Sequence, residues 1–288
     1  MLTVKRHANV DAFLADAGRF LGEREAEHNL LLGICTNLQR HAEAFADRPL
    51  PVFLTVIDGA GGVVGASLRT PPFNQVLSEM DEDAARLVAA TLADAHEELP
   101  GLLGPMKAAQ AFVATWEARS GQRARINRRE RIFRCTRIVP PRPAPGTWRR
   151  IDERDRDILG PWYVAFHDEA LPEDPPLDDL DAMVERWLAG TIRTFYVWEA
   201  GGDRVCLVGA GGETPGGTRI GPVYTPPEHR GRGYASNLTA AVTQAMFDAG
   251  RTFCFLFTDL ANPTSNKIYQ AIGYEPVTDV DEYAFRRA

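Results

Sequence analysis

The sequence predicts a mixed α/β protein made of two similar domains. A proline-rich segment lies almost at the midpoint of the 288 residues, and it predicts a stiff connector because proline is excluded from helix interiors and central strands. The same order of helix and strand patterns occurs on both sides of this segment. We therefore expect one domain at residues 1–138, a linker at 139–146 and a second domain at residues 147–288.

The same strand pattern occurs in both halves. An apolar run is followed by a glycine-containing turn, a second apolar run and a Thr-Pro pair that ends it. The runs are Pro51–Ile57 and Val63–Arg69 in the first half, and Phe195–Trp198 and Arg204–Gly212 in the second. The halves share this pattern but few identical residues, so the sequence indicates a repeat of fold rather than of residues.

Helices are predicted upstream of these strands and again near the end of each half. The upstream helical patterns cover Asp11–Gly22, Glu23–Glu43, Glu153–Phe166 and Leu177–Ala189. Both halves are then expected to end with a helix followed by a hairpin. These segments are Met106–Arg119 before Arg125–Ile138, and Ser265–Ile272 before Glu275–Phe285.

Composition narrows the functional classes. The chain is 44% hydrophobic and 25% charged, with a net charge of −7 and a pI near 5.5, which is typical of a soluble globular protein. Such an acidic chain disfavours a nucleic-acid partner and is compatible with a cationic substrate such as an amine. The four cysteines stand alone, so we expect neither a metal site nor a disulfide framework. Because no signal peptide and no membrane-length apolar run is recognisable, we expect a cytoplasmic protein without a membrane partner.

A strand, a glycine loop and a helix in the second half predict an anion site. The strand pattern Thr218–Thr225 is followed by Arg230-Gly231-Arg232-Gly233-Tyr234-Ala235-Ser236, which runs into a helical pattern at Asn237–Ala249. Glycine permits a sharp turn, and the first-turn amides of a helix bind anions, so this loop with its two arginines predicts a diphosphate site. A Walker loop is excluded because no Gly-Lys-Ser/Thr follows, and a dinucleotide fingerprint would need Gly or Ala where Ser236 stands.

The segment that follows carries a family resemblance. Phe253–Phe257 predicts a buried central strand, and Asn262, Ser265 and Tyr269 follow it before Gly273-Tyr274. Together with Arg-x-x-Gly-x-Ala at residues 230–235, these elements resemble the GCN5-related N-acetyltransferase superfamily over roughly residues 147–288. The resemblance implies that each domain is a central, mostly antiparallel sheet flanked by helices. It also implies acetyl-CoA as cosubstrate and no metal.

The resemblance further implies roles for individual residues. Main-chain groups of Val223 and Thr225 would bind the pantetheine arm of coenzyme A, and Asn262 would also bond this arm. Ser265 or Asn266 would lie near the coenzyme, and Tyr269 would be the general acid that protonates the departing thiolate. Backbone amides would hold the pyrophosphate beside the charge of Arg230; they belong to Gly231, Arg232, Gly233, Ala235 and Ser236.

The implied reaction is direct transfer of an acetyl group to a primary amine in a ternary complex. A small-molecule amine is the first expectation for the acceptor and a protein amine the second, with the enzyme a monomer or homodimer. The strand Thr218–Thr225 contains no acid, so the general base stays open among a water relay and Glu213, Glu199, Asp168, Glu169 and His167. A non-catalytic coenzyme A or acyl-CoA sensor is the alternative function, and a nucleotide-binding module is a further one.

The first half lacks the cofactor loop. At the equivalent place, Phe73–Asp81 contains no glycine and no basic residue, and Glu79 and Asp81 would repel a diphosphate. We therefore expect a degenerate copy that has lost coenzyme A binding and that walls the substrate cleft or supports dimerisation. The basic stretch Arg123–Arg137 is expected to be the solvated face of the first hairpin, with an anionic ligand or a domain interface as the alternative.

Overall fold

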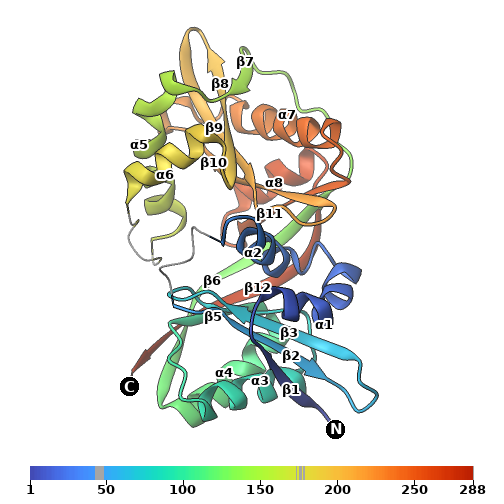
Figure 1. Cartoon of the computed structure of the whole chain (residues 1–288). Helices are drawn as coiled ribbons and strands as arrows, with labels where there is room; N and C mark the ends of the chain where they lie inside the picture. The colour runs from blue at the N-terminus through green and yellow to red at the C-terminus, as the bar shows by residue number, and fades with distance from the viewer. Residues whose placement is uncertain (43–48, 173, 175–176, 178, 288) are drawn as a thin grey trace. The chain divides into compact units, whose positions relative to one another are not determined.

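The structure is a computed structural model that describes residues 1–42, 49–172, 174, 177 and 179–287 (Figure 1). Its contacts divide the chain into two compact units. Unit 1 comprises Met1–Ile132, Thr258–Ala261 and the segment from Pro276 onward, and unit 2 comprises Phe133–Phe257 and Asn262–Glu275. No helix in the described part of the chain is long and apolar enough to cross a membrane.

Unit 1 is built on a mostly antiparallel sheet. The strand order is β1-β2-β3-β4-β5-β12-β6, and only β4 and β5 pair in parallel among the registers described. The strands are β1 (Thr3–His7), β2 (Val52–Ile57), β3 (Val63–Arg69), β4 (Gln75–Leu77), β5 (Gly101–Pro105), β6 (Gln122–Cys135) and β12 (Glu275–Arg287). The helices are α1 (Val10–Glu23), α2 (Asn29–Arg40), α3 (Glu82–Asp94) and α4 (Met106–Ser120).

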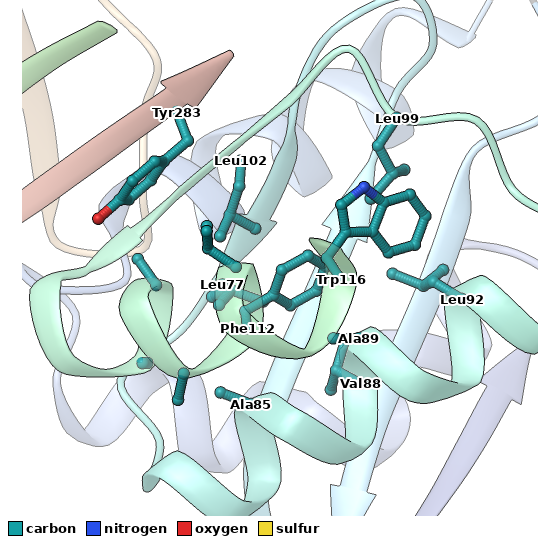
Figure 2. Packing of buried hydrophobic residues seen from close by; sticks show 14 of the residues in the cluster. Leu77, Ala85, Val88, Ala89, Leu92, Leu99, Leu102, Phe112, Trp116 and Tyr283 are labelled. Carbon is teal, nitrogen blue, oxygen red and sulfur yellow. The ribbon is translucent and has the colours of Figure 1, made fainter. Parts of the chain in front are cut away.

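Helices cover both faces of the unit 1 sheet. Alternate residues of β2 point to opposite faces, so Val52, Leu54 and Val56 join one core cluster and Phe53 joins the other. The first cluster is formed with α3 and α4, where Phe112 stacks on Trp116 at 6.0 Å between ring centroids (Figure 2). The second cluster is formed with α1 and α2. Such two-sided burial explains why every residue of β2 except Thr55 is apolar.

Unit 2 repeats this arrangement. Its strands are β7 (Thr147–Arg150), β8 (Arg193–Ala200), β9 (Asp203–Gly211), β10 (Gly217–Tyr224) and β11 (Phe253–Asp259), and the end of β6 lies next to β11. Its helices are α5 (Arg156–Ala170), α6 (Leu180–Ala189), α7 (Tyr234–Asp248) and α8 (Pro263–Ala271). Cys206 and Val208 of β9 face the core formed with α7 and α8, whereas Leu207 faces the core formed with α5 and α6.

The predicted fold class is confirmed. Both units have a central sheet flanked by helices. Among the registers described, the neighbouring strands of both are antiparallel except for one parallel pair in each, β4 with β5 and β10 with β11. The order of elements is also the same in the two halves of the sequence: one strand, two helices, three strands, a helix, a strand, a helix and a final strand. The predicted repeat is therefore a repeat of topology.

The expected terminal hairpins are wrong. Arg125–Ile138 and Glu275–Phe285 instead contribute to two long single strands, β6 and β12, of 14 and 13 residues. Strand β12 pairs with β5 in unit 1, with Tyr283 opposite Leu102. Gly101 is needed at this contact, because a Cβ there would collide with the main-chain oxygen of Tyr283. Strand β12 thus pairs with β5, which is distant in sequence, and not with a neighbouring strand of a hairpin.

The division into units also differs from the expected domain boundaries. Residues from 276 onward belong to unit 1 although they follow unit 2 in sequence, and the proline-rich segment 139–146 lies within unit 2. This segment is held there by hydrogen bonds: Trp198 Nε1 donates to Pro145 O at 2.8 Å and Asn237 Nδ2 donates to Arg142 O at 3.0 Å. The chain passes between the units inside β6, on either side of Thr258–Ala261 and again at the start of β12.

Ion pairs hold two arginines of the basic stretch that precedes this segment. Arg131 makes a two-pronged pair with Asp279 at 2.6 and 2.8 Å, and Arg128 pairs with Glu282 at 2.5 Å. Arg128 and Arg131 of β6 therefore face acidic residues of β12 within unit 1, whereas Arg123, Arg125, Arg134 and Arg137 are exposed. The expectation of a solvated face is confirmed for these exposed arginines and corrected for Arg128 and Arg131, because β12 supplies the opposite charges.

Candidate functional site

The candidate site of unit 2 begins where β10 leaves β11. The two strands pair in parallel from Gly217 to Arg219, whereas the pairing of β10 with β9 continues to Tyr224. An irregularity between Ile220 and Val223 contains Gly221 and Pro222, and Pro222 has no N–H for the ladder. Val223 and Thr225 lie beyond this irregularity, at the end of β10.

A tight loop then leads into α7. Gly231 and Gly233 have φ values of 74° and 81°, which glycine adopts without the cost that a Cβ would impose. A Cβ added at Gly231 would meet no atom within 4 Å, so the backbone conformation rather than crowding calls for glycine there. The helix begins at Tyr234, three residues before the predicted start, so Ala235 and Ser236 belong to its first turn.

The start of α7 presents unpaired donors. Its N-cap is Gly233, no side chain of the described residues caps it, and the first intrahelical bond runs from Asn237 N to Gly233 O at 3.1 Å. The amides of Tyr234, Ala235 and Ser236 therefore have no acceptor within the helix, at its positive end. An anion is the natural partner for such a helix start.

The equivalent helix of unit 1, α3, has a closed start, because a side chain caps it. The carboxylate of Asp81 caps α3 by accepting a hydrogen bond from Ala84 N at 2.7 Å. A side-chain anion already occupies the position that a phosphate would take at this helix. This geometry explains in physical terms why the first half lacks a diphosphate loop.

The two arginines of the loop are bound to protein groups. Arg230 Nη2 contacts both carboxylate oxygens of Glu169 at 2.7 and 2.9 Å, and its Nε donates to Thr225 O at 2.8 Å. Arg232 donates to the main-chain oxygen of Glu228 at 3.1 Å. The charge of Arg230 is thus balanced by a carboxylate, whereas the Arg232 guanidinium bonds a neutral carbonyl.

Asn262 follows β11 in the sequence and is the N-cap of α8. Its side-chain oxygen accepts from Ser265 N at 3.0 Å, and its main-chain oxygen accepts from Asn266 Nδ2 at 2.8 Å. The capping contact leaves the side-chain NH₂ group of the exposed Asn262 as the donor for a ligand. The three predicted residues Asn262, Ser265 and Asn266 therefore form one local cluster.

Tyr269 lies in the core of unit 2. Its ring packs edge-to-face on Tyr274 at 6.0 Å, and burial, with a smaller contribution from the Cys206 thiol, raises the pKa of Tyr269 well above its usual value. Thr225 Oγ1 in turn donates to Cys206 Sγ at 3.2 Å. Cys206 and Tyr269 belong to the same core cluster, so the predicted acid shares a core with the thiol that Thr225 contacts at the end of the predicted pantetheine strand.

The predicted candidates for the general base are engaged with other groups. Glu199 accepts from Arg149 at 2.7 Å, Glu213 pairs with Arg251 at 2.6 Å, and Glu169 pairs with Arg230 as described above. His167 lies 3.8 Å from Asp168. These contacts single out none of the five residues as the base.

Two cavities of unit 1 are distinct from this site. One of about 570 Å³ lies at the ends of β4 and β5, where Glu79, Lys107 and the Arg131–Asp279 pair line it, and another of about 880 Å³ lies near Arg69. Neither contains a glycine loop at an uncapped helix start, so volume alone does not identify the functional site. Within the described residues, no group of three or more His, Cys, Asp or Glu side chains could hold a metal ion.

Comparisons with known proteins agree with the fold. Residues 204–283 match the family described as FR47-like protein, a range that contains the α7 loop and Tyr269. A search of the curated proteins finds no significant match. A Drosophila protein of solved structure shares 16% identity at a TM-score of 0.67, over 98% of this chain and 97% of its own.

Two acetyltransferase structures have the same fold. One is a GNAT-family acetyltransferase from Colwellia psychrerythraea, with 11% identity and a TM-score of 0.56 over 99% of this chain and 100% of its own. The other is a GCN5-related N-acetyltransferase from Kribbella flavida, with 18% identity and a TM-score of 0.51 over 88% and 95%. The family model thus matches part of the second half of the chain, and these structures show that the chain shares the fold of GCN5-related N-acetyltransferases.

Proposed function

We propose that the chain is an acyltransferase that moves an acetyl group from acetyl-CoA to a primary amine, and that unit 2 carries the reaction. The observation that supports this most strongly is the uncapped, glycine-bounded start of α7 directly after β10 departs from β11. A diphosphate fits such a helix start. The closed α3 of unit 1 makes one working site per chain the expectation.

Binding would be divided among three parts of unit 2. Main-chain groups of Val223 and Thr225 would hold the pantetheine arm, and the side-chain amide of Asn262 would bond it, with Ser265 and Asn266 near the coenzyme. The pyrophosphate would lie on the amides of the loop and of the first turn of α7. This arrangement would fix the thioester for attack and so supply proximity.

Tyr269 would act at the leaving sulfur. Acetyl-CoA supplies an activated thioester carbonyl; in direct transfer the amine nitrogen bonds this carbon, the C–S bond breaks and the sulfur takes a proton. Because burial raises the pKa of Tyr269, its phenol stays protonated and can donate a hydrogen bond to the sulfur as negative charge develops. Burial also raises the pKa of Cys206 to about 12, which favours direct transfer over a thiolate nucleophile. The group that deprotonates the amine stays unassigned.

The substitution Tyr269→Phe tests the proposed acid. We expect kcat for acetylation of an amine from a library to fall about 100-fold, while the Kd for coenzyme A measured by calorimetry stays unchanged. Tyr274→Phe is the matched control, because the Tyr274 hydroxyl contacts Thr243 at 2.6 Å and its loss should lower stability but not kcat. Unchanged transfer in Tyr269→Phe would rule out the acid role.

A non-catalytic sensor of coenzyme A or acyl-CoA is the second candidate. The engaged carboxylates around unit 2 favour it, since no general base is identified. Thermal-shift measurements with coenzyme A, acetyl-CoA, NAD and ATP, followed by the amine screen, separate the two functions. Stabilisation by acetyl-CoA without acetylation of any amine supports the sensor, and stabilisation by NAD alone contradicts both.

A further inference from the structure

Helix α5 contacts the end of β10 and the cofactor loop at two points. The Trp162 ring lies 6.1 Å from the Tyr224 ring, and Glu169 binds Arg230 at 2.7 Å. Residues seven apart share one face of a helix, so both contacts belong to the same side of α5. The helix is therefore anchored to the strand end and to the loop together.

Arg230 joins three segments through one guanidinium. Its Nε donates to Thr225 O at 2.8 Å, its Nη2 donates to Glu169, and its central carbon lies 5.9 Å from the centre of the Tyr224 ring. The last carbonyl after β10, the start of the loop and the end of α5 are thereby held at fixed distances. An arginine suits this task because its donors form a rigid, planar fork.

We propose that Glu169 is a positioning residue of the cofactor site. By fixing Arg230, it sets the distance between the pantetheine end of β10 and the diphosphate amides of α7. This inference rests on the proposed function, in which coenzyme A is the ligand that would bridge both parts. A ligand that spans two subsites gains affinity only when their spacing matches its own length.

The alternative, a direct contact of Arg230 with phosphate, makes the opposite prediction. In that case Glu169 would compete with the phosphate for the guanidinium, and removing its charge would tighten binding of every ligand that carries a phosphate. If Glu169 instead positions the loop, removing its charge weakens only ligands that reach both subsites.

The experiment compares two ligands in Glu169→Gln. Coenzyme A spans both subsites, whereas adenosine 3′-phosphate 5′-diphosphate carries the phosphates without the pantetheine arm. We expect calorimetry to give a Kd for coenzyme A about fivefold weaker than in the wild type, the upper range for an exposed ion pair, with the Kd for the nucleotide unchanged. Glu169→Asp should recover part of the loss. The matched control is Glu185→Gln, which removes another exposed carboxylate–arginine pair of unit 2 and should change neither Kd.

Every other outcome overturns the inference. Equal coenzyme A affinity in Glu169→Gln and wild type removes any positioning role. Tighter binding of both ligands shows that Arg230 contacts phosphate, and equal weakening of both shows that Glu169 only maintains the fold of the loop. If the wild-type protein binds the nucleotide but not coenzyme A, or binds neither, the proposed function fails first and the inference falls with it.

Discussion

His28 shows how burial and hydrogen bonding fix the protonation state of a single residue in unit 1. It is fully buried, its Nδ1 lies 3.1 Å from Leu21 O, and its Nε2 accepts from Glu79 N at 3.2 Å. These partners require a neutral imidazole with the proton on Nδ1, and burial accordingly lowers the pKa of His28 below 6.5. One uncharged ring thereby joins the turn before α2 to the segment that follows β4.

The pH dependence of stability tests this assignment. Because the unfolded state binds the proton at a higher pH than the folded state, we expect stability to fall as the pH decreases below about 6.5. Each pKa unit of the shift corresponds to about 1.4 kcal/mol at a pH below the folded pKa. Urea unfolding of wild type and His28→Gln at pH 7.5 and 5.0 should show a smaller pH dependence in the variant, because glutamine cannot titrate. An equal dependence in both proteins would contradict the neutral, buried assignment.

The contrast between α3 and α7 explains which part of the candidate site the sequence could predict. Gly231, Gly233 and the acidic character of Asp81 are visible in the sequence, so an open helix start in one half and a closed one in the other could be expected. The contact of Cys206 with Thr225 could not be predicted, because it depends on the pairing of β9 with β10 across an irregular register. The Glu169–Arg230 pair likewise depends on the packing of α5, which a local sequence pattern does not specify.

Charge reversal tests whether the ion pairs between β6 and β12 stabilise these strands. Arg131→Glu places like charges together beside Asp279 and should destabilise the protein by about 1 kcal/mol, since both side chains are partly exposed. The reversed pair Arg131→Glu with Asp279→Arg should recover at least half of this loss in urea unfolding. As a control, Arg19→Glu disrupts only the exposed Arg19–Glu23 pair of α1 and should have a smaller effect. No recovery in the reversed pair would show that the contact does not stabilise the strands.

At the scale of the whole molecule, each unit is completed by residues distant in sequence. Tyr283 and Phe285 of β12 enter the core of unit 1, where Phe285 stacks on Trp116 at 5.8 Å, while Phe133 and Cys135 at the end of β6 enter the core of unit 2. The sequence predicted strands at both places, because alternation of apolar residues is a local property. It could not predict their partners, because pairing depends on which strand edges are open once the rest has folded.

Removal of residues 276–288 tests whether β12 completes unit 1. We expect unit 1 to be affected although the deleted residues follow unit 2, because β5 loses its partner and Trp116 loses an aromatic neighbour. Hydrogen exchange followed by mass spectrometry should show faster exchange in Gly101–Pro105, with the amides of β8 and β9 still protected. Loss of protection confined to unit 2 would contradict the assignment of β12 to unit 1.

The position of β12 has a consequence for the order of synthesis. A ribosome makes all the other strands of unit 1 early, but β12 only after every strand of unit 2 has been made. During that interval the edge of β5 that β12 covers lacks its partner, and such an edge is a template for pairing with other chains. The nascent chain therefore depends on rapid completion, or on a chaperone that shields this edge, to avoid aggregation.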